Sequence, residues 1–421
     1  MIKVPRIREE TLGNGIKVIY AKSRAYPAIL AVIRAGSFYE TEDNSGISHV
    51  SEHLLFSGTN QDGMRTEDEI YYRIHELTGD MDNGRDWSCY TTFDHVTLGL
   101  RTLLPDFESA AHLISSALSE SQITPLKVER EKQMVIDEMA GYSESNYMAL
   151  IPMFLNAVFK QHPMRKYPGG DTEKVRNLLY ENVLNFYREM FVPEAIIITG
   201  NVPFSEAMRV SEAYFGHFGQ PKRVYPPNDE PENYDERVTM HAGLQRSHLM
   251  TGLKVFNTSA RERDLLKLAG AYFGRRFYEK IYTQEAIAYY CYGSYMTRIW
   301  ESALNYGFLV ASVNCDEKFF GHAQEIIEES FWELTALGFP SEIITQLGQS
   351  FSNSYLFIRE NSLNTARLLM ADYLRSGVRH PDEYTSSFRA YSAQMVEDAV
   401  KKYITPVVKA GLLTRIAIVP K

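Results

Sequence analysis

The sequence predicts an α+β protein of two domains, each with an antiparallel sheet packed against helices. The chain has 421 residues, enough for more than one core. Segments with strand-like alternation are followed by long helical segments, and this order occurs twice. Between the two occurrences, residues 220–236 are rich in proline and acidic residues and follow neither period, as a linker does. The predicted domains are therefore residues 1–219 and 237–421.

In the first half, two segments with strand-like alternation come first, "GIKVIYAKS" and "AILAVIRAGSFYE". Polar turn residues then precede a predicted helix at about residues 46–57. A second helix is predicted at about 66–78, because Thr66 and Glu69 have the spacing of a capping box. The other predicted elements are strands at 88–101, helices at 105–119 and 126–158, a short buried strand at 195–203 and a helix at 205–218.

The second half repeats the order of strands followed by helices. Its predicted elements are strands at 236–243 and 247–255, a helix at 260–284, paired strands at 286–296 and 306–315, helices at 318–337, 341–359 and 362–375, and a last strand at 412–421. The last strand, "LLTRIAIVPK", resembles in pattern the "AIIITGNVP" that ends the first half. This repetition of pattern, without sequence identity, predicts two duplicated domains.

The composition argues against several classes of protein. The net charge of −9 and the pI of about 5.7 disfavour nucleic acid as the main partner, which requires a basic face. The cysteines Cys89, Cys291 and Cys315 form no CxxC pair, so neither a disulfide framework nor a cysteine zinc site is predicted. The N-terminus lacks the apolar segment of a signal peptide, and no stretch has the length of a membrane span. We therefore expect a cytoplasmic protein without a nucleic-acid or membrane partner.

The segment "SGISHVSEHLLFSGT", residues 45–59, suggests a metal site. Within the predicted helix, His49 and His53 are four residues apart and share a face. Two neutral imidazoles can bind one metal ion there, and Glu52 lies at the edge of the same face. A catalytic zinc ion takes three protein ligands and one water molecule, whose pKa it lowers. Glu52 is therefore predicted to accept a proton from that water and to pass it to the leaving amine.

A third ligand has to come from another element. The predicted helix around "VEREKQMVIDEMAGY" offers Glu129, Glu131, Asp137 and Glu138. Glu131 and Glu138 are seven residues apart and share a face. Glu138 is the predicted third ligand, and Glu131 is predicted to accept the free N–H of a ligand histidine. A structural interpretation exists for each part, since core histidines and acidic solvated helices are common, but the combination favours a metal site.

These motifs resemble peptidase family M16, which includes pitrilysin, insulysin and the mitochondrial processing peptidase. HxxEH is the inverzincin signature, and "GISHVSEHLLFSGT" is similar to the family's zinc-binding segment. Other segments are similar to later parts of the family: "CYTTFDHV", "EREKQMVIDEM", "HPMRKYPGGDTEKV" and "AIAY". The resemblance covers essentially the whole chain and is specific in the first half.

The resemblance implies that His49, His53 and Glu138 bind Zn2+, that Glu52 is the general base and that Glu131 supports catalysis. It implies a clamshell of two homologous α+β domains, as in metallohydrolases of the LuxS and mitochondrial-processing-peptidase type, that encloses unfolded peptides. The chain has the length of one half of such a chamber, as in single-length M16B members. Two chains are therefore expected to associate as a homodimer or a heterodimer.

Some positions depart from the family pattern. Ser88 stands where the strand near the zinc helix carries Asn, and extra residues surround "DNGRDW". Tyr289 matches the tyrosine of the family's substrate-binding Arg–Tyr pair, but Tyr282 stands where Arg is expected. Ser88, Tyr282 and Tyr289 are the predicted substrate-binding residues. The resemblance favours a zinc subunit whose partner supplies the Arg–Tyr pair, with Arg298 as an alternative within this chain.

The sequence therefore leads to one main hypothesis and two alternatives. The main hypothesis is a zinc endopeptidase for short or unfolded peptides, which would add a strand to the edge that follows Ser88. One alternative is a non-catalytic scaffold or binding subunit of the same fold. The other is a dedicated processing subunit for a specific precursor peptide. The sequence identifies neither the natural peptide nor the partner, and His and carboxylate ligands also accept other divalent ions.

Overall fold

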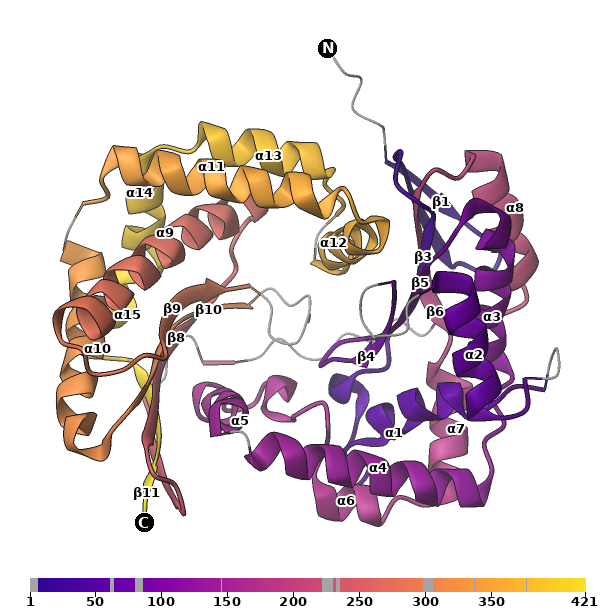
Figure 1. Cartoon of the computed structure of the whole chain (residues 1–421), viewed down its shortest axis with the longest axis horizontal. Helices are drawn as coiled ribbons and strands as arrows, with labels where there is room; N and C mark the ends of the chain where they lie inside the picture. Colours follow the sequence, from indigo (N-terminus) through magenta and orange to yellow (C-terminus); the bar gives the residue numbers. More distant parts are fainter. Residues whose placement is uncertain are drawn as a thin grey trace.

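The structure is a computed structural model that describes residues 7–60, 64–79, 86–144, 146–221, 230–231, 235–297, 306–336, 338–375 and 377–421. Figure 1 shows two lobes side by side, each with a sheet and a layer of helices. We call residues up to 219 the first half and residues from 237 onward the second half. No helix in the described part of the chain is both long and apolar enough to cross a membrane.

The first half contains a six-stranded sheet of order β1-β2-β6-β3-β5-β4. Its strands are β1 (Arg8–Thr11), β2 (Lys17–Lys22), β3 (Ala28–Ile33), β4 (Trp87–Thr91), β5 (Val96–Arg101) and β6 (Pro193–Gly200). Its helices are α1 (Ile47–His53), α2 (Glu67–Thr78), α3 (Phe107–Ser119), α4 (Pro125–Glu144), α5 (Asn146–Val158), α6 (Thr172–Arg176), α7 (Tyr180–Met190) and α8 (Phe204–Phe215).

The second half contains a five-stranded sheet of order β7-β11-β8-β10-β9. Its strands are β7 (Arg237–Ala242), β8 (Ser247–Phe256), β9 (Cys291–Met296), β10 (Tyr306–Cys315) and β11 (Thr414–Pro420). Its helices are α9 (Ala260–Tyr278), α10 (Phe320–Ala336), α11 (Ser341–Ile358), α12 (Ser362–Arg375), α13 (Pro381–Ala390), α14 (Ala393–Tyr403) and α15 (Thr405–Lys409).

The two sheets share one topology, which confirms the two-domain α+β prediction. The order β2-β6-β3-β5-β4 in the first half matches β7-β11-β8-β10-β9 in the second. In each half the strand that comes last in the sequence lies between the first and third strands of this order, parallel to the first and antiparallel to the third. The prediction of purely antiparallel sheets is therefore wrong. The sheets are mixed because the chain returns through a series of helices before it forms its last strand, so the last strand can pair in the parallel direction.

The two halves exchange one helix each. On the face of the first sheet away from α3 and α8, Leu30 and Val32 form a buried cluster with Leu363 and Leu369 of α12. α12 belongs to the second half by sequence but packs on β3, β5 and β6. Burial of such leucine side chains is worth about 1.5–3 kcal/mol each. The second half therefore supplies the cover for one face of the first sheet.

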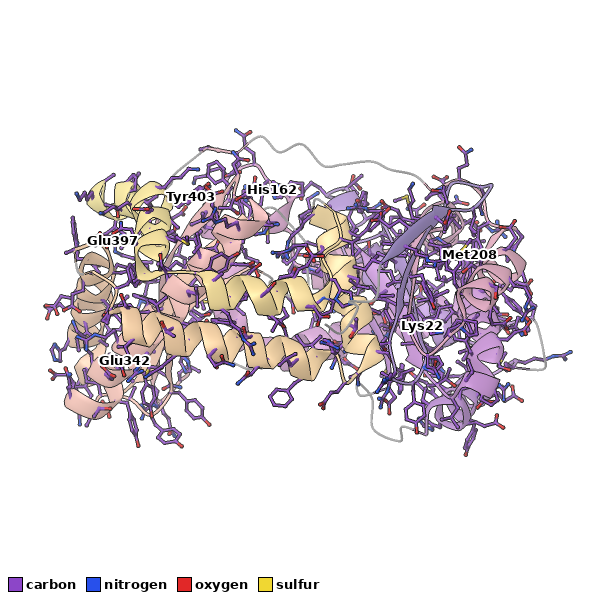
Figure 2. The ribbon with its side chains drawn as sticks, turned by 90° about the horizontal axis from the view of Figure 1, so that it is seen from above. Lys22, His162, Met208, Glu342, Glu397 and Tyr403 are labelled. Atoms are coloured by element: carbon purple, nitrogen blue, oxygen red, sulfur yellow. The ribbon has the colours of Figure 1, made fainter. Side chains whose placement is uncertain are left out.

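The reciprocal contact is made by α5. Phe154 and Leu155 of α5 pack with Phe308, Val310 and Ile418 of the second sheet, and the rings of Phe154 and Phe308 lie 5.9 Å apart at 78°. Figure 2 places His162, which follows α5, over the lobe that carries Tyr403. His162 there contacts the ring of Tyr306 of β10 at 4.8 Å. Each half thus covers a sheet face of the other, and the two form one packed unit.

Polar contacts reinforce this exchange. The Thr199 hydroxyl on β6 donates to the carbonyl of Ser362 at 2.7 Å. Lys254 on β8 donates to the Glu230 carboxylate at 3.2 Å, and only 2% of each side chain is exposed. Glu230 also accepts the backbone N–H groups of residues 160–162. The predicted linker is therefore fastened to both halves at Glu230, while residues 222–229 and 232–234 lie outside the described residues.

Several predicted elements differ from the structure. The predicted helix at 126–158 corresponds to two helices, α4 and α5, and residue 145 between them lies outside the described residues. The predicted helix at 46–57 ends as an α-helix at His53 and continues as the 3₁₀ turn Leu54–Phe56. The predicted helix at 260–284 ends in a π-helix over Glu279–Gln284.

The predicted strand at 286–296 is also wrong in its first part. Ala286 has a φ of 51°, in the left-handed region, which no strand residue adopts. The strand β9 begins only at Cys291. β1, α7 and α13 to α15 lie in segments for which the sequence analysis predicted no element.

The exchanged helices predict that the first half cannot fold alone. A fragment of residues 1–219 lacks α12 and exposes the apolar side of α5, so we expect it to bind a hydrophobic dye and to aggregate. Co-expression with residues 220–421 should restore a soluble complex with one cooperative thermal transition. A soluble, monomeric 1–219 fragment with cooperative unfolding would contradict this dependence.

Candidate metal and active site

The backbone around α1 is held from both sides. The Glu40 carboxylate accepts the backbone N–H groups of Gly46 and Ser48 at 2.8 and 3.0 Å, before and within the first turn. Gly46 and Gly170 both have left-handed backbones, with φ of 88° and 78°. A Cβ atom on Gly170 would lie 2.3 Å from the Cα of Gly46. The loop that contains Gly170 thus packs directly on the start of α1 and fixes the helix that carries the two histidines.

The side chains of His49, His53 and Glu138 meet between α1 and α4. Glu138 Oε2 lies 3.5 Å from Nε2 of His49 and 3.5 Å from Nε2 of His53. The three ligand atoms lie within 4.8 Å of one another, and this is the one His/Cys/Asp/Glu group with metal spacing among the described residues. A tetrahedral zinc ion with bonds of about 2.0–2.1 Å separates its ligands by about 3.4 Å. Two imidazole nitrogens and one carboxylate oxygen at these spacings fit zinc.

Glu131 lies behind His53. Its carboxylate is buried, and its Oε2 lies 3.3 Å from Nδ1 of His53, while Arg130 donates to Oε1. Burial alone would raise the pKa of Glu131, but the hydrogen bonds with His53 and Arg130 outweigh it and lower the pKa. Glu131 therefore stays ionised at neutral pH and holds the proton of His53 on Nδ1, which leaves Nε2 toward the Glu138 side.

Glu52 lies beside the three ligand atoms rather than among them. Its Oε2 is 3.8 Å from Nε2 of His49, and the Thr91 hydroxyl on β4 donates a long hydrogen bond to it at 3.5 Å. Only 7% of Glu52 is exposed. Burial and the Glu52 carboxylate raise the pKa of the neighbouring Cys89 thiol well above its usual value, so the thiol is neutral.

The two histidines differ in their protonation. Burial lowers the pKa of His49, because the imidazolium form loses its hydration. Burial acts in the same direction on His53, but its hydrogen bonds with Glu131 and Glu138 outweigh burial and raise the pKa to about 10. A cation that binds Nε2 of His53 has to displace that proton, so metal affinity should rise with pH.

These residues line a cavity of about 680 Å³. One wall is aromatic: the ring of Phe56 lies 5.6 Å from Tyr71 and 5.8 Å from Trp87. The indole N–H of Trp87 has no hydrogen-bond partner among the described residues. Among the described residues, all those that line the cavity fall between His49 and Gly169, and none belongs to the second half.

The predicted substrate-binding residues do not meet at this cavity. Ser88 lies on β4, the last strand of its sheet in the described chain, and is not a lining residue, although its neighbours Trp87, Cys89, Tyr90 and Thr91 are. Ser88 shares its side of the strand with Tyr90, which does line the cavity, so strand alternation does not decide the role of Ser88, and that role stays a prediction.

Tyr282 and Tyr289 lie in the second half, away from the cavity lining. They are 40% and 71% exposed, and their rings are 5.8 Å apart. Arg298, the alternative cation, lies outside the described residues, as do residues 80–85 of the predicted insertion.

Sequence reasoning missed several residues of the site. Glu40 and Arg130 had a weak signal, since one lies just before the histidine helix and the other is next to Glu131. Tyr71 and Trp87 had no signal, because only the pairing of β4 and the packing of α2 bring them to the histidines.

Two family descriptions match the sequence. "Insulinase (Peptidase family M16)" matches residues 18–168, and "Peptidase M16 inactive domain" matches residues 177–347. Residues 169–176, within the first half, separate the two matches, and the first match contains the histidines, Glu52, Glu131 and Glu138.

Named relatives are distant and longer than the matched region. A "Probable mitochondrial-processing peptidase subunit beta" of Schizosaccharomyces pombe is 25% identical over 51% of this chain and 46% of that protein. An uncharacterized zinc protease of Mycobacterium leprae is 23% identical over 68% of this chain and 64% of that protein. The cytochrome b-c1 complex subunit 1 of Mus musculus is 24% identical over 54% of this chain and 46% of that protein. The matched segment thus spans about half to just under two thirds of these relatives.

Solved structures share the whole fold. A protease from Helicobacter pylori superposes with a TM-score of 0.84 at 16% identity, over 99% of this chain and 100% of that one. A peptidase M16 inactive domain from Pseudomonas fluorescens gives 0.82 at 12% identity, over 99% and 98%. At these identities the likeness concerns the fold alone.

Replacement of Glu40 by Gln should change the pH dependence of stability. Burial raises the pKa of Glu40 to about 7, although the N–H groups of Gly46 and Ser48 oppose this. Because the folded pKa lies above the unfolded one, the wild type loses stability as pH rises from about 4.5 to 7. We expect the free energy of unfolding of Glu40→Gln, relative to wild type, to increase across this window.

Chemical denaturation at a series of pH values measures this difference, with exposed Glu9→Gln on β1 as the control. The histidine ligands titrate in all three proteins and cancel. A difference between wild type and Glu40→Gln that stays constant from pH 4 to 8 would contradict the buried, proton-binding carboxyl.

Proposed function

The chain belongs to peptidase family M16, and from that premise we propose that it is a zinc-dependent endopeptidase for short or unfolded peptides. One observation carries the proposal. The Glu52 carboxylate lies 3.8 Å from Nε2 of His49, beside the His49–His53–Glu138 group and in the same cavity. Peptide hydrolysis at a metal needs three protein ligands and an adjacent carboxylate that does not bind the metal, and this arrangement is present here.

His49, His53 and Glu138 would hold the zinc ion. The bound ion would lower the pKa of a water molecule and polarise the scissile carbonyl. Glu52 then accepts the proton of that water on its carboxylate and donates it to the leaving amine. Its burial keeps the proton away from bulk solvent, and Thr91 orients the carboxylate that carries it.

The peptide would lie along β4. This strand ends its sheet in the described part of the chain and has β5 as its one strand partner. An extended peptide can add to such an edge through backbone hydrogen bonds, which requires no particular sequence. Cys89 and Thr91 of β4 line the cavity beside Glu52, so a peptide on this edge passes the proposed ligands.

Selectivity would come from the aromatic wall. Phe56, Tyr71 and Trp87 surround space next to His53, and apolar side chains of a substrate gain free energy by burial there. We infer a preference for a large apolar or aromatic residue close to the scissile bond.

We further propose that the chain works as one of two associated subunits, identical or unlike. The second half contributes no lining residue to the cavity in the described chain, and Tyr282 and Tyr289 are exposed on it. Two relatives carry the word subunit in their names, one of a mitochondrial-processing peptidase and one of the cytochrome b-c1 complex. A related subunit would then supply the Arg–Tyr pair. The cytoplasmic location and the processing of one precursor peptide stay predictions from the sequence.

A non-catalytic subunit of the same fold is the second candidate. The description "Peptidase M16 inactive domain" for residues 177–347 favours it in part. The intact His49, Glu52, His53 and Glu138 in the other matched region favour catalysis.

Replacement of Glu52 by Gln should abolish peptide cleavage and leave zinc bound. Loss of a general base lowers kcat by about 10²–10⁴-fold. Mass spectrometry of peptide mixtures incubated with the purified chain measures cleavage, and metal analysis measures zinc. His53→Ala is the matched variant, which should lose both. Normal cleavage by Glu52→Gln would show that another residue is the base, and cleavage by zinc-free protein would exclude the proposed chemistry.

Replacement of Tyr71 by Ala should reduce selectivity. We expect kcat/KM for peptides with Phe or Leu beside the scissile bond to fall by roughly tenfold or more, because the lost ring removes apolar contact. Peptides with Ala at that position should lose much less. Tyr72→Ala is the matched control, since the neighbouring Tyr72 is 74% exposed and does not line the cavity. Equal losses for both peptides would argue against a side-chain pocket.

A further inference from the structure

We propose that Arg130 is a positioning residue of the metal site, which aligns the Glu131 carboxylate with His53 and is itself anchored by Glu67 of α2. The proposal rests on the proposed zinc site and adds a connection from that site to another helix. Arg130 touches none of the three proposed ligands, so it would act through Glu131.

The two oxygens of Glu131 have separate partners. Arg130 donates to Oε1 through Nε at 2.9 Å and through Nη2 at 2.6 Å. Oε2 faces Nδ1 of His53 at 3.3 Å. Two donors of a planar guanidinium on one oxygen restrict the rotation of the carboxylate, so the other oxygen keeps its direction toward the histidine.

Arg130 is in turn held by α2. Its Nη2 also donates to Glu67, the first residue of that helix. The start of α2 is fixed by the capping box of Thr66 and Glu69, in which each side chain bonds the backbone of the other. The order of contacts is therefore Glu67, Arg130, Glu131 and His53, and it runs from a capped helix to a proposed zinc ligand.

The burial of Glu131 makes the loss of its Arg130 partner costly. Glu131 is 5% exposed, so few water molecules are available to replace a lost partner. Without Arg130 the buried carboxylate would keep His53 as a partner but lose the group that orients it. Partners that orient a ligand histidine typically contribute 10–100-fold to metal affinity. The Arg130 side chain itself is 52% exposed, so its removal leaves no large cavity in the core.

Arg130 also lines the cavity, so a role in binding substrate carboxylates is the competing explanation. The two roles differ in what they change. Loss of a positioning residue lowers the zinc affinity, which is measured without substrate, and also lowers kcat. Loss of a substrate-binding residue changes KM alone.

The experiment compares Arg130→Ala, Arg130→Lys and Glu67→Gln with wild type in the full-length chain. Zinc affinity is measured by competition with a chromophoric chelator, and peptide kinetics are measured on the zinc-loaded proteins. We expect Arg130→Ala to lose about 10–100-fold in zinc affinity and to lower kcat at nearly constant KM. Arg130→Lys should recover part of the affinity, and Glu67→Gln should lose less than Arg130→Ala.

Arg73→Ala is the matched control. Arg73 lies on α2, as Glu67 does, and forms an ion pair with Glu76, but it does not line the cavity. It should leave zinc affinity and kcat unchanged. If Arg130→Ala fails to fold, Arg130→Lys and Glu67→Gln give the same comparison, because both keep the bulk of the replaced side chain.

Wild-type zinc affinity in folded Arg130→Ala or, failing that, in both milder variants would overturn the proposal. A raised KM with unchanged zinc affinity and kcat would overturn it as well and assign Arg130 to substrate binding. A wild-type chain that binds no zinc would overturn the proposed function along with it. If the wild type binds zinc and the variants bind it with the same affinity, only the positioning role of Arg130 is rejected.

Discussion

The docking of α5 on the second sheet is the contact on which the site depends. α4 carries Glu131 and Glu138, and α5 follows it in the chain with one residue between the two helices. Phe154 and Leu155 of α5 are buried against Phe308 and Val310 of the second half. The second half therefore anchors the C-terminal end of the helix that faces the histidines. It contributes no lining residue to the cavity in the described chain, but its sheet holds the helix that follows the one with Glu138.

The other end of the site is fixed by contacts around α1. This helix has seven residues and is too short to be stable by itself. The Glu40 carboxylate bonds its first turn, and the loop around Gly170 packs on Gly46. Burial of the Glu40 carboxyl costs free energy, and its hydrogen bonds with the backbone of Gly46 and Ser48 offset part of that cost. The site is thus assembled from the short helix α1, held by these contacts, and the long helix α4, which packs on α1, α6 and α7 and is followed by α5. Carboxylates lie beside both helices, and Arg130 restrains one of these carboxylates, that of Glu131.

Local geometry explains which predictions agree with the structure. The spacing of His49 and His53 fixes their common direction on any helix, and the seven-residue spacing does the same for Glu131 and Glu138. That α1 meets α4 depends on long-range packing, and the resemblance to a family supplied it where physical reasoning could not. Ser88 is not among the lining residues although its neighbours on β4 are, and its role in substrate binding stays a prediction. The structure leaves the chemical roles of all these residues as predictions.

Long-range pairing also explains the errors in the fold. The last strand of each half pairs with strands more than a hundred residues earlier in the chain, and nothing in its own sequence states a direction. The exchange of α5 and α12 had no sequence signal, because both helices are amphipathic whichever sheet they cover.

The most direct test of the account is a crystal structure of zinc-soaked Glu52→Gln protein with a bound peptide, read by anomalous scattering at the zinc edge. The account predicts one zinc peak within about 2.0–2.2 Å of His49, His53 and Glu138. It also predicts a peptide paired with β4 whose carbonyl faces that peak, with residue 52 beside the carbonyl. A zinc ion bound elsewhere, or a peptide that avoids β4, would contradict the central claim.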